Sequence, residues 1–152
     1  MTIYKRAITA TVYVVREGKV LLHLHKKYKM WFPIGGHVEP DEFPHEAAYR
    51  EAMEEAGIEI RLVNTEIAPA IDVGRVLRIP APFCLYGEDG TPDNFFDFIY
   101  IAETDCETVT PGDGESPTFR WFSEEDLQTF DVKPHIKNTA LAVLKYLGNK
   151  VE

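Results

Sequence analysis

The chain has 152 residues, the size of one domain, and its 45% content of hydrophobic residues is enough to bury a core. We therefore expect residues 1–152 to form a single folded domain rather than a disordered chain. The formal net charge of −9 argues against binding to a nucleic-acid polymer or an anionic membrane surface. The sequence also has no apolar run close to the roughly 20 residues that a membrane span requires.

The chain is expected to begin with two strands joined by a tight turn. Residues 8–15 are rich in threonine and valine and predict one strand, and residues 19–25 predict the second. The first apolar run follows Lys5 and Arg6, as in a signal peptide, but Arg16 ends it without a small-residue cleavage site. A strand of the mature protein is therefore the favoured interpretation.

A helix is expected over residues 44–56, where the apolar residues recur with helical spacing. Pro44 suits the first helical position and Gly57 suits the left-handed position after the last turn. Phe43 stands where a capping side chain would be expected, which is a local flaw in the pattern. At 100° per residue, one apolar side of the helix is predicted to consist of Ala48, Tyr49, Ala52, Met53 and Ala56.

The rest of the chain predicts further strands and two helices. Residues 58–67 and the stretch that contains Pro69, Pro80 and Pro82 predict strands interrupted by loops, followed by a turn region at 87–92 and a strand over 94–102. An acidic glycine-rich loop is expected at 111–117 and a short extended segment at 119–122. A capping box at 123–126 opens a short helix, and an amphipathic helix is expected over 134–147. Strands on both sides of a central helix, with a helix at the end, predict a mixed α/β sandwich.

Three glutamates of the central helix are the most informative residues. Glu51, Glu54 and Glu55 occupy positions i, i+3 and i+4, so their side chains converge on one face. Like charges at this spacing repel by a few tenths of a kcal/mol per pair, so either basic partners or a cation should compensate them. A solvated, salt-bridged helix face is the alternative, because Arg50 can pair with Glu46 or Glu54.

The glutamates belong to a longer pattern with fixed spacing. Five residues separate Gly36 from Glu42, and seven more lead to Arg50-Glu51-Ala52-Met53-Glu54-Glu55-Ala56-Gly57-Ile58. This pattern, over residues 36–58, resembles the Nudix box at every required position. The resemblance implies an α/β/α sandwich with a central mixed sheet and a loop–helix–loop catalytic motif. It also implies hydrolysis of a phosphoanhydride bond in a small organic pyrophosphate, with Mg²⁺ or Mn²⁺ as cofactor.

The resemblance also implies roles for individual residues. Glu51, Glu54 and Glu55 are the implied metal ligands, oriented by Arg50, while Glu42 braces Arg50 or reaches the metal through water. Mg²⁺ prefers oxygen ligands and keeps several waters, so three glutamates suit it, and the Gly35 carbonyl could add a further oxygen. Gly36 and Gly57 are supporting residues, because Gly36 lets the backbone come close and Gly57 ends the helix.

The base that accepts a proton from the attacking water has three candidates. Glu51 and Glu54 lie inside the box, and Glu115 lies outside it, six residues before Trp121. Some Nudix proteins have a catalytic or metal-binding glutamate at a comparable distance before such a tryptophan. A solvated loop carboxylate is the alternative interpretation of Glu115.

The substrate is less well defined by the sequence. Motifs of the dinucleoside polyphosphate, ADP-ribose, NADH and coenzyme A groups are absent, which weakens those assignments without eliminating them. His25 and Lys27, in a basic run with His23, Lys26 and Lys29, are candidates to contact phosphates, with a solvated strand end and loop as the alternative. Trp31 is a candidate to stack on a base, with a place in the core as the alternative, and Asp97, an acid in an apolar strand, either enters the substrate cleft or faces solvent. A nucleoside triphosphate or a nucleoside diphosphate derivative is the expected substrate.

Three other classes of protein remain as alternatives. A prenyl diphosphate isomerase on the same fold would need a catalytic cysteine, and neither Cys84 nor Cys106 lies in a motif for that role. A non-catalytic nucleotide-sensing Nudix domain usually shows a damaged box, and a plain acidic interaction domain would need no box. The two separated cysteines predict reduced thiols and a cytoplasmic location. The sequence is compatible with a homodimer.

Overall fold

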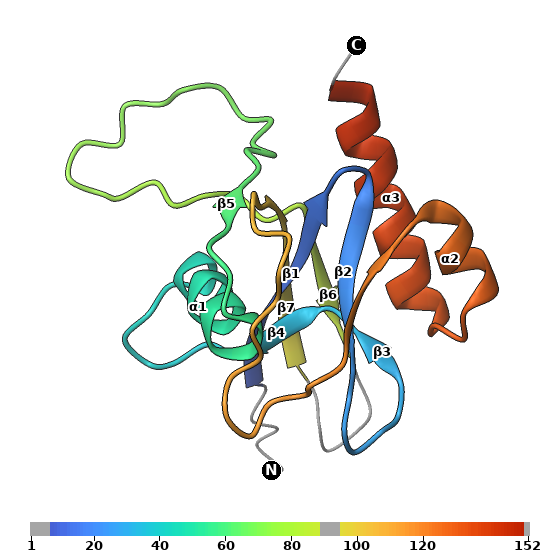
Figure 1. Ribbon diagram of the computed structural model, residues 1–152. Coiled ribbons are helices and arrows are strands. Elements are labelled where there is room, and N and C mark those ends of the chain that lie inside the picture. Colours follow the sequence, from blue (N-terminus) through green and yellow to red (C-terminus); the bar gives the residue numbers. More distant parts are fainter. Residues whose placement is uncertain (1–6, 89–94, 151–152) are drawn as a thin grey trace.

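A mixed β-sheet forms the centre of the computed structural model, which describes residues 7–88 and 95–150 (Figure 1). The described strands are β1 (Ala7–Arg16), β2 (Lys19–Leu24), β3 (Trp31–Phe32), β4 (Ile34–His37), β5 (Arg61–Leu62), β6 (Cys84–Gly87), β7 (Phe95–Glu103) and β8 (Phe119–Phe122). Their order is β3-β2-β1-β7-β5, while β4 pairs with β1, β6 with β7 and β8 with β2. Most of the turn expected at 87–92 lies outside the described residues.

The sheet is mixed because β1 and β7 run parallel while the other pairs are antiparallel. The predicted opening hairpin is confirmed by the pairing of Val15 with Val20. Neighbouring strands also align in rows. Thr9 lies opposite both His37 on β4 and Asp97 on β7, and Asp97 lies opposite Tyr86 on β6.

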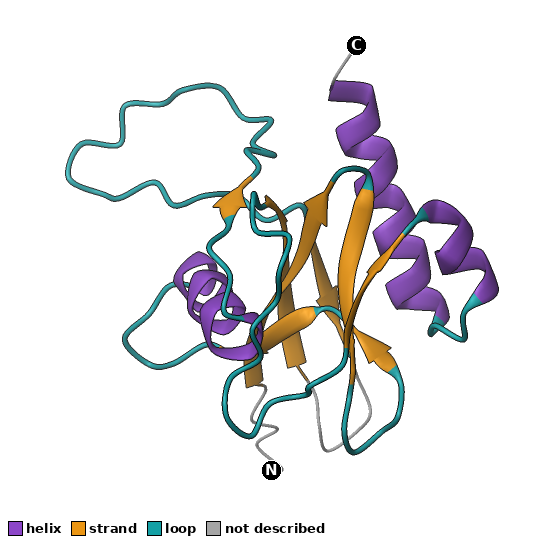
Figure 2. Ribbon diagram, viewed as in Figure 1, coloured by secondary structure: helices purple, strands orange, loops and turns teal. Residues whose placement is uncertain are grey.

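Helices cover both faces of the sheet, so the fold is the expected α/β/α sandwich (Figure 2). The helix α1 (Pro44–Glu51) covers one face, and α3 (Pro134–Lys150), with the short α2 (Glu124–Thr129) beside it, covers the other. Alternate residues of β1 supply the two cores: Ala10, Val12 and Val14 pack with alanines of α1, whereas Tyr13 and Val15 pack with Ile136, Ala140 and Val143 of α3. No helix within the described ranges is both long and apolar enough to cross a membrane.

The predicted central helix is present, but it is not regular throughout. It is α-helical to Glu51 and then continues as a π-helical turn, η1 (Ala52–Ala56), in which the N–H of Gly57 reaches the carbonyl of Ala52. The predicted apolar side is wrong for two of its five members, since Tyr49 is 42% and Met53 49% exposed. The buried surface consists instead of alanines, namely Ala47, Ala48, Ala52 and Ala56. The small alanine side chains let the helix lie close to the sheet. The π-helical turn η1 departs from 100° per residue, so the side predicted with that angle does not coincide with the buried side.

Both ends of this helical segment are stabilised by local contacts. At the start, the N–H of Phe43 donates to Glu46 Oε2 at 2.7 Å, so Glu46 compensates for the absent capping side chain. At the other end, Gly57 has a φ of 64°, as predicted for a left-handed terminal residue. A Cβ at this position would also lie 2.5 Å from the carbonyl oxygen of Thr110.

The strand expected over residues 58–67 is wrong in extent, because only Arg61–Leu62 form β5. The reason is competition for one edge of β7. There β5 pairs with Ala102 and Glu103, while β6 occupies the positions from Phe96 to Ile99. The chain between β5 and β6 therefore leaves the sheet as a long loop that projects from the body (Figure 1). Several of its apolar side chains are exposed: Ile67, Ile71, Val76 and Leu77.

Candidate active site

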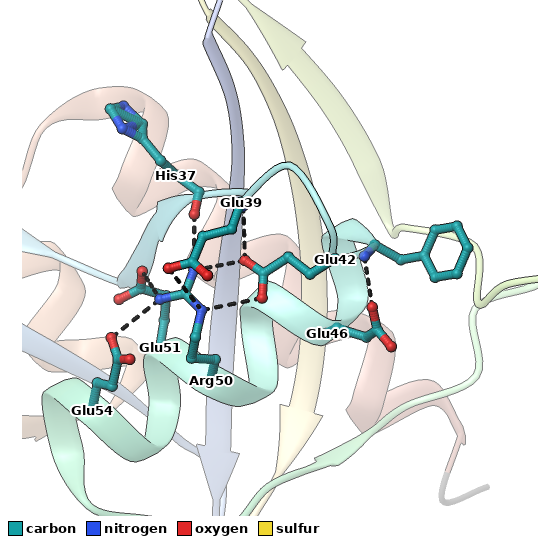
Figure 3. Close-up of polar contacts among 8 residues, drawn as sticks. His37, Glu39, Glu42, Glu46, Arg50, Glu51 and Glu54 are labelled. Atoms are coloured by element: carbon teal, nitrogen blue, oxygen red, sulfur yellow. Dashed lines mark hydrogen bonds and ion pairs between the residues drawn. The ribbon is translucent and has the colours of Figure 1, made fainter.

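Arg50 is the centre of a network of carboxylates on α1 and the loop before it (Figure 3). Its Nη2 and Nε donate to the two oxygens of Glu42 at 2.7 and 3.1 Å. Its Nη1 donates to Glu51 at 2.8 Å and to Glu54 at 3.1 Å, and Nη2 also reaches the carbonyl oxygen of His37 at 2.9 Å. The bond to Arg50 lowers the pKa of Glu42. The predicted contact between Glu42 and Arg50 is therefore present, and this one arginine hydrogen-bonds to three glutamates and forms a longer ion pair, of 3.9 Å, with a fourth, Glu39.

Glu51 is packed against the backbone of β4. Its side chain is only 13% exposed. A Cβ built on Gly36 would overlap the Glu51 carboxylate, so glycine at position 36 is required for this approach. Burial raises the pKa of Glu51, while the hydrogen bond from Arg50 opposes that shift.

Glu55 is the most deeply buried of the three glutamates, with 7% of its surface exposed. The N–H of Gly35 donates to Glu55 Oε1 at 3.2 Å, and His23 Nε2 lies 3.4 Å from Oε2. Burial, followed by the charge of Glu51 and a hydrogen bond with it, raises the pKa of Glu55 to about 9. The two carboxylates therefore favour a shared proton, an arrangement that a bound cation could replace.

The donors at this site suit a hard divalent cation, because all of them are carboxylate or backbone oxygens. Within the described part of the chain, no three His, Cys, Asp or Glu groups already form a ligand set. Glu54 is directed to Arg50, and Glu51 and Glu55 are directed to each other. Glu54 is the most accessible of the three, with 54% of its side chain exposed.

A cavity of about 690 Å³ opens beside the glutamates. Glu55, Gly35 and Gly36 line one end of it, together with Glu115 from the loop between β7 and β8. The negative charge of Glu115 contributes to the raised pKa of Glu55, so these two acids are close in space although 60 residues separate them in the sequence. The Lys26 ammonium donates to the carbonyl of Gly114 at 2.9 Å and holds this loop in place.

Only some of the residues proposed from the sequence to contact the substrate lie at the cavity. His25 and Asp97 line the cavity, whereas Lys27 and Trp31 do not belong to its described lining. Trp31 packs edge-on against Phe122 and Phe130, and Lys27 lies over the ring of Tyr28. Of the two orientations considered for Asp97, the structure has the one in which its side chain enters the cleft.

Other lining residues were not singled out by the sequence. They include Thr9, Thr11, Tyr13, Tyr28, Lys133 and His135. The signal for the first three was present, because polar residues alternate with apolar ones along β1 and alternate residues share one face of a sheet. Lys133 and His135 lie at the cavity because the start of α3 packs beside it, and the local sequence does not predict this packing.

The fold and the site define a Nudix protein, and comparison with known families agrees. The model of the NUDIX domain matches residues 5–142, so the chain belongs to this family and is a Nudix hydrolase. A crystal structure of a NUDIX-family hydrolase from Clostridium perfringens is 36% identical, with a TM-score of 0.81, and the match covers 94% of this chain and 99% of that one.

More distant structures share the fold. A MutT protein from Methanosarcina mazei Go1 is 18% identical with a TM-score of 0.71, over 97% of this chain and 99% of that chain. An Ap4A hydrolase from C. elegans, crystallised as a binary complex, is 19% identical with a TM-score of 0.62, over 95% and 97% of the two chains.

Proposed function

We propose that this Nudix hydrolase uses Mg²⁺ or Mn²⁺ to hydrolyse a phosphoanhydride bond in a nucleoside triphosphate or nucleoside diphosphate derivative, by attack of water on phosphorus. One observation carries the proposal. The buried carboxylate of Glu55 lies beside Glu51, against the backbone of β4, at the end of a cavity that also contains Glu115. Burying acids together is unfavourable unless a cation or a proton compensates them.

The cation would be held by Glu51, Glu54 and Glu55, with the Gly35 carbonyl as a further oxygen donor. When bound, it supplies positive charge to the phosphate oxygens and makes water more acidic. Arg50 keeps Glu51 and Glu54 oriented through Nη1 of its guanidinium group, and Glu42 in turn holds Arg50 through Nη2.

The proton released by the attacking water needs an acceptor within the cavity. Glu51, Glu54 and Glu115 are the candidates. Glu115 has the most direct access, because it lines the cavity, and no ion pair among the described residues involves it. A general base must lie within hydrogen-bond reach of the water, either directly or through one further water molecule.

The cavity suits a small anionic molecule. Its volume of about 690 Å³ falls within the range of small-ligand sites, about 300–1,000 Å³. Lys26, Lys133 and His25 supply positive or hydrogen-bonding groups for phosphate, and Tyr28 and Phe32 supply aromatic surface for an organic group. Neither cysteine belongs to the described lining, which disfavours the isomerase that would use a cysteine.

The proposal can be tested with a panel of nucleoside triphosphates and nucleoside diphosphate derivatives, incubated with Mg²⁺, with Mn²⁺ or with EDTA. We expect cleavage that depends on the divalent cation and incorporation of ¹⁸O from labelled water into a phosphate-containing product. Glu55→Gln should lose this activity, while Glu125→Gln, which removes an exposed carboxylate outside the cavity, should keep it. Absence of cleavage across the panel, with the cation bound, would instead favour a nucleotide-sensing domain.

A further inference from the structure

Besides the glutamates Glu55, Glu88 and Glu115, the cavity is lined by an aspartate, Asp97. Asp97 lies on β7, on the floor formed by β1, β7 and β6. The strand β4, which carries Gly35, is on the other side of β1. Two strand spacings and a shift of two residues separate Gly35 from Asp97, which corresponds to about 12 Å. The Asp97 carboxylate contacts Thr11, whereas the Glu55 carboxylate contacts Gly35 and His23, and the proposed cleavage mechanism does not use Asp97.

Asp97 is held in place by a neighbouring strand. The Thr11 hydroxyl lies 2.9 Å from both Oδ1 and Oδ2, so its single hydrogen is shared between the two oxygens. No ion pair among the described residues involves Asp97. Burial raises the pKa of this carboxyl, and hydrogen bonds from the threonines oppose the shift. Both oxygens thus retain capacity to accept hydrogen bonds, on the floor of a ligand-sized cavity.

Aromatic groups lie around the same cavity. The rings of His25 and Tyr28 are 4.7 Å apart, and Phe32 lies 5.5 Å from His25. Tyr86, directly opposite Asp97 in the sheet, contributes another ring to the lining. Aromatic surface combined with a hydrogen-bond acceptor is the chemistry that binds a flat heterocycle bearing N–H groups, as in a nucleobase.

We propose that Asp97 is a specificity-determining residue that accepts hydrogen bonds from the exocyclic amino group of a nucleobase, so that the preferred substrates are nucleotides of amino-bearing bases. This inference rests on the proposed function for the position of the phosphates. It assigns the base of the substrate to the part of the cavity that contains Asp97. Thr11 is a positioning residue, which fixes the carboxylate that contacts the base.

The test uses nucleoside triphosphates in pairs in which one member lacks the amino group: GTP with ITP, ATP with purine riboside triphosphate, and CTP with UTP. We expect the wild-type protein to favour the amino-bearing member of at least one pair by about 10-fold or more in kcat/KM. A hydrogen bond to a charged group contributes about 1.5–3 kcal/mol, and about 1.4 kcal/mol corresponds to a factor of ten.

Two variants and one control assign the effect to Asp97. Asp97→Asn removes the charge and replaces one of the two acceptor oxygens by an NH2 donor at nearly constant volume, and should reduce the discrimination to about 3-fold or less. Thr11→Val should reduce it in part, through loss of the hydroxyl that orients Asp97. Asp105→Asn removes an exposed carboxylate, 88% accessible and outside the cavity, and should leave the discrimination unchanged. Equal use of both members of every pair by the wild type, or unchanged discrimination in Asp97→Asn, would overturn the proposal.

A binding measurement separates this inference from the proposed function. Calorimetric titration with GMP, IMP, AMP, CMP and UMP requires no cleavage and measures the affinity for each base directly. We expect tighter binding of an amino-bearing monophosphate to the wild type, and loss of that preference in Asp97→Asn. If no triphosphate is cleaved but this binding preference is present, the proposed reaction is wrong, whereas the proposed contact of Asp97 with the base is supported. If triphosphates are cleaved but neither assay shows a base preference, the reaction stands and the role proposed for Asp97 is wrong.

Discussion

The carboxylate of Glu51 occupies the space that a side chain at position 36 would need. The contact joins the helix that carries the acids to the strand that lines the cavity, and it leaves no room for even one methyl group. The present position of the Glu51 carboxylate therefore depends on a glycine at position 36.

Gly36→Ala is expected to displace the Glu51 carboxylate. Because this group is the far end of a flexible side chain, the loss of stability should be small, whereas the displacement should reduce Mn²⁺ affinity and turnover by at least about 10-fold. Thermal unfolding and Mn²⁺ titration measure the two effects. Gly148→Ala is the matched control, because a Cβ on Gly148 meets nothing within 4 Å. Full metal affinity in Gly36→Ala would show that the close contact is dispensable.

Glu54→Gln should abolish turnover and weaken metal binding while the fold survives. The side chain is 54% exposed, and its described contact is an ion pair with Arg50, so little of the free energy of unfolding depends on it. Steady-state kinetics, metal titration and circular dichroism check the three parts of the expectation. Near-normal turnover would remove Glu54 from the proposed ligand set.

Arg50→Ala should reduce kcat more than it changes KM, because Arg50 orients carboxylates and is not part of the described cavity lining. Arg50→Lys should restore little, since an ammonium cannot donate to Glu42, Glu51 and Glu54 with the fork geometry of a guanidinium. Kinetic constants for both variants check this expectation. An unchanged kcat in Arg50→Ala would count against an orienting role.

The stability of the metal-free protein should depend on pH through Glu55. Its pKa is raised from 4.5 to about 9, chiefly by burial, so the folded protein holds the proton more tightly than the unfolded chain. This stabilising contribution is complete below about pH 4.5 and is lost as the pH rises through about 9. In EDTA, Tm should therefore fall from pH 5 to pH 9, and less steeply in Glu55→Gln. Parallel curves for the variant and the wild type would contradict this assignment.

Glu115→Gln tests whether Glu115, which lies outside the Nudix box, is the general base. If Glu115 accepts the proton, the acidic limb of the kcat profile should disappear and the rate should fall by about 10²–10⁴-fold. Measurement of kcat and kcat/KM against pH, at saturating Mg²⁺, checks this. A profile that keeps its wild-type shape would leave Glu51 and Glu54 as the candidates.

The sequence predicted the elements that depend on local patterns. The hairpin of β1 and β2, the helix at Pro44 and the helix at Pro134 all have clear periodicity and end signals, and they are present. The glutamates were proposed as metal ligands from their spacing, and the contact of Arg50 with Glu42 agrees with the proposed bracing role.

The features that were missed depend on contacts between distant segments. The strand at 58–67 is short because β6 occupies the edge of β7 that it would need, which periodicity cannot reveal. The direction of Asp97 depends on the register between β1 and β7, 86 residues apart at Thr11 and Asp97. The exposure of Met53 follows from close packing of alanines and from the π-helical turn.

The π-helical turn η1 also restricts how the length of this segment can vary. A π-helical turn needs one residue more than an α-helical turn, so deleting one residue between Ala52 and Ala56 would restore ordinary i→i+4 bonding and leave the residues after the turn in nearly the same orientation. The change would fall on the turn itself, where Glu54 and Glu55 would be shifted or removed, even though the helix became more regular. Among related chains, insertions and deletions should therefore accumulate in the projecting loop between β5 and β6 and be excluded from these five residues.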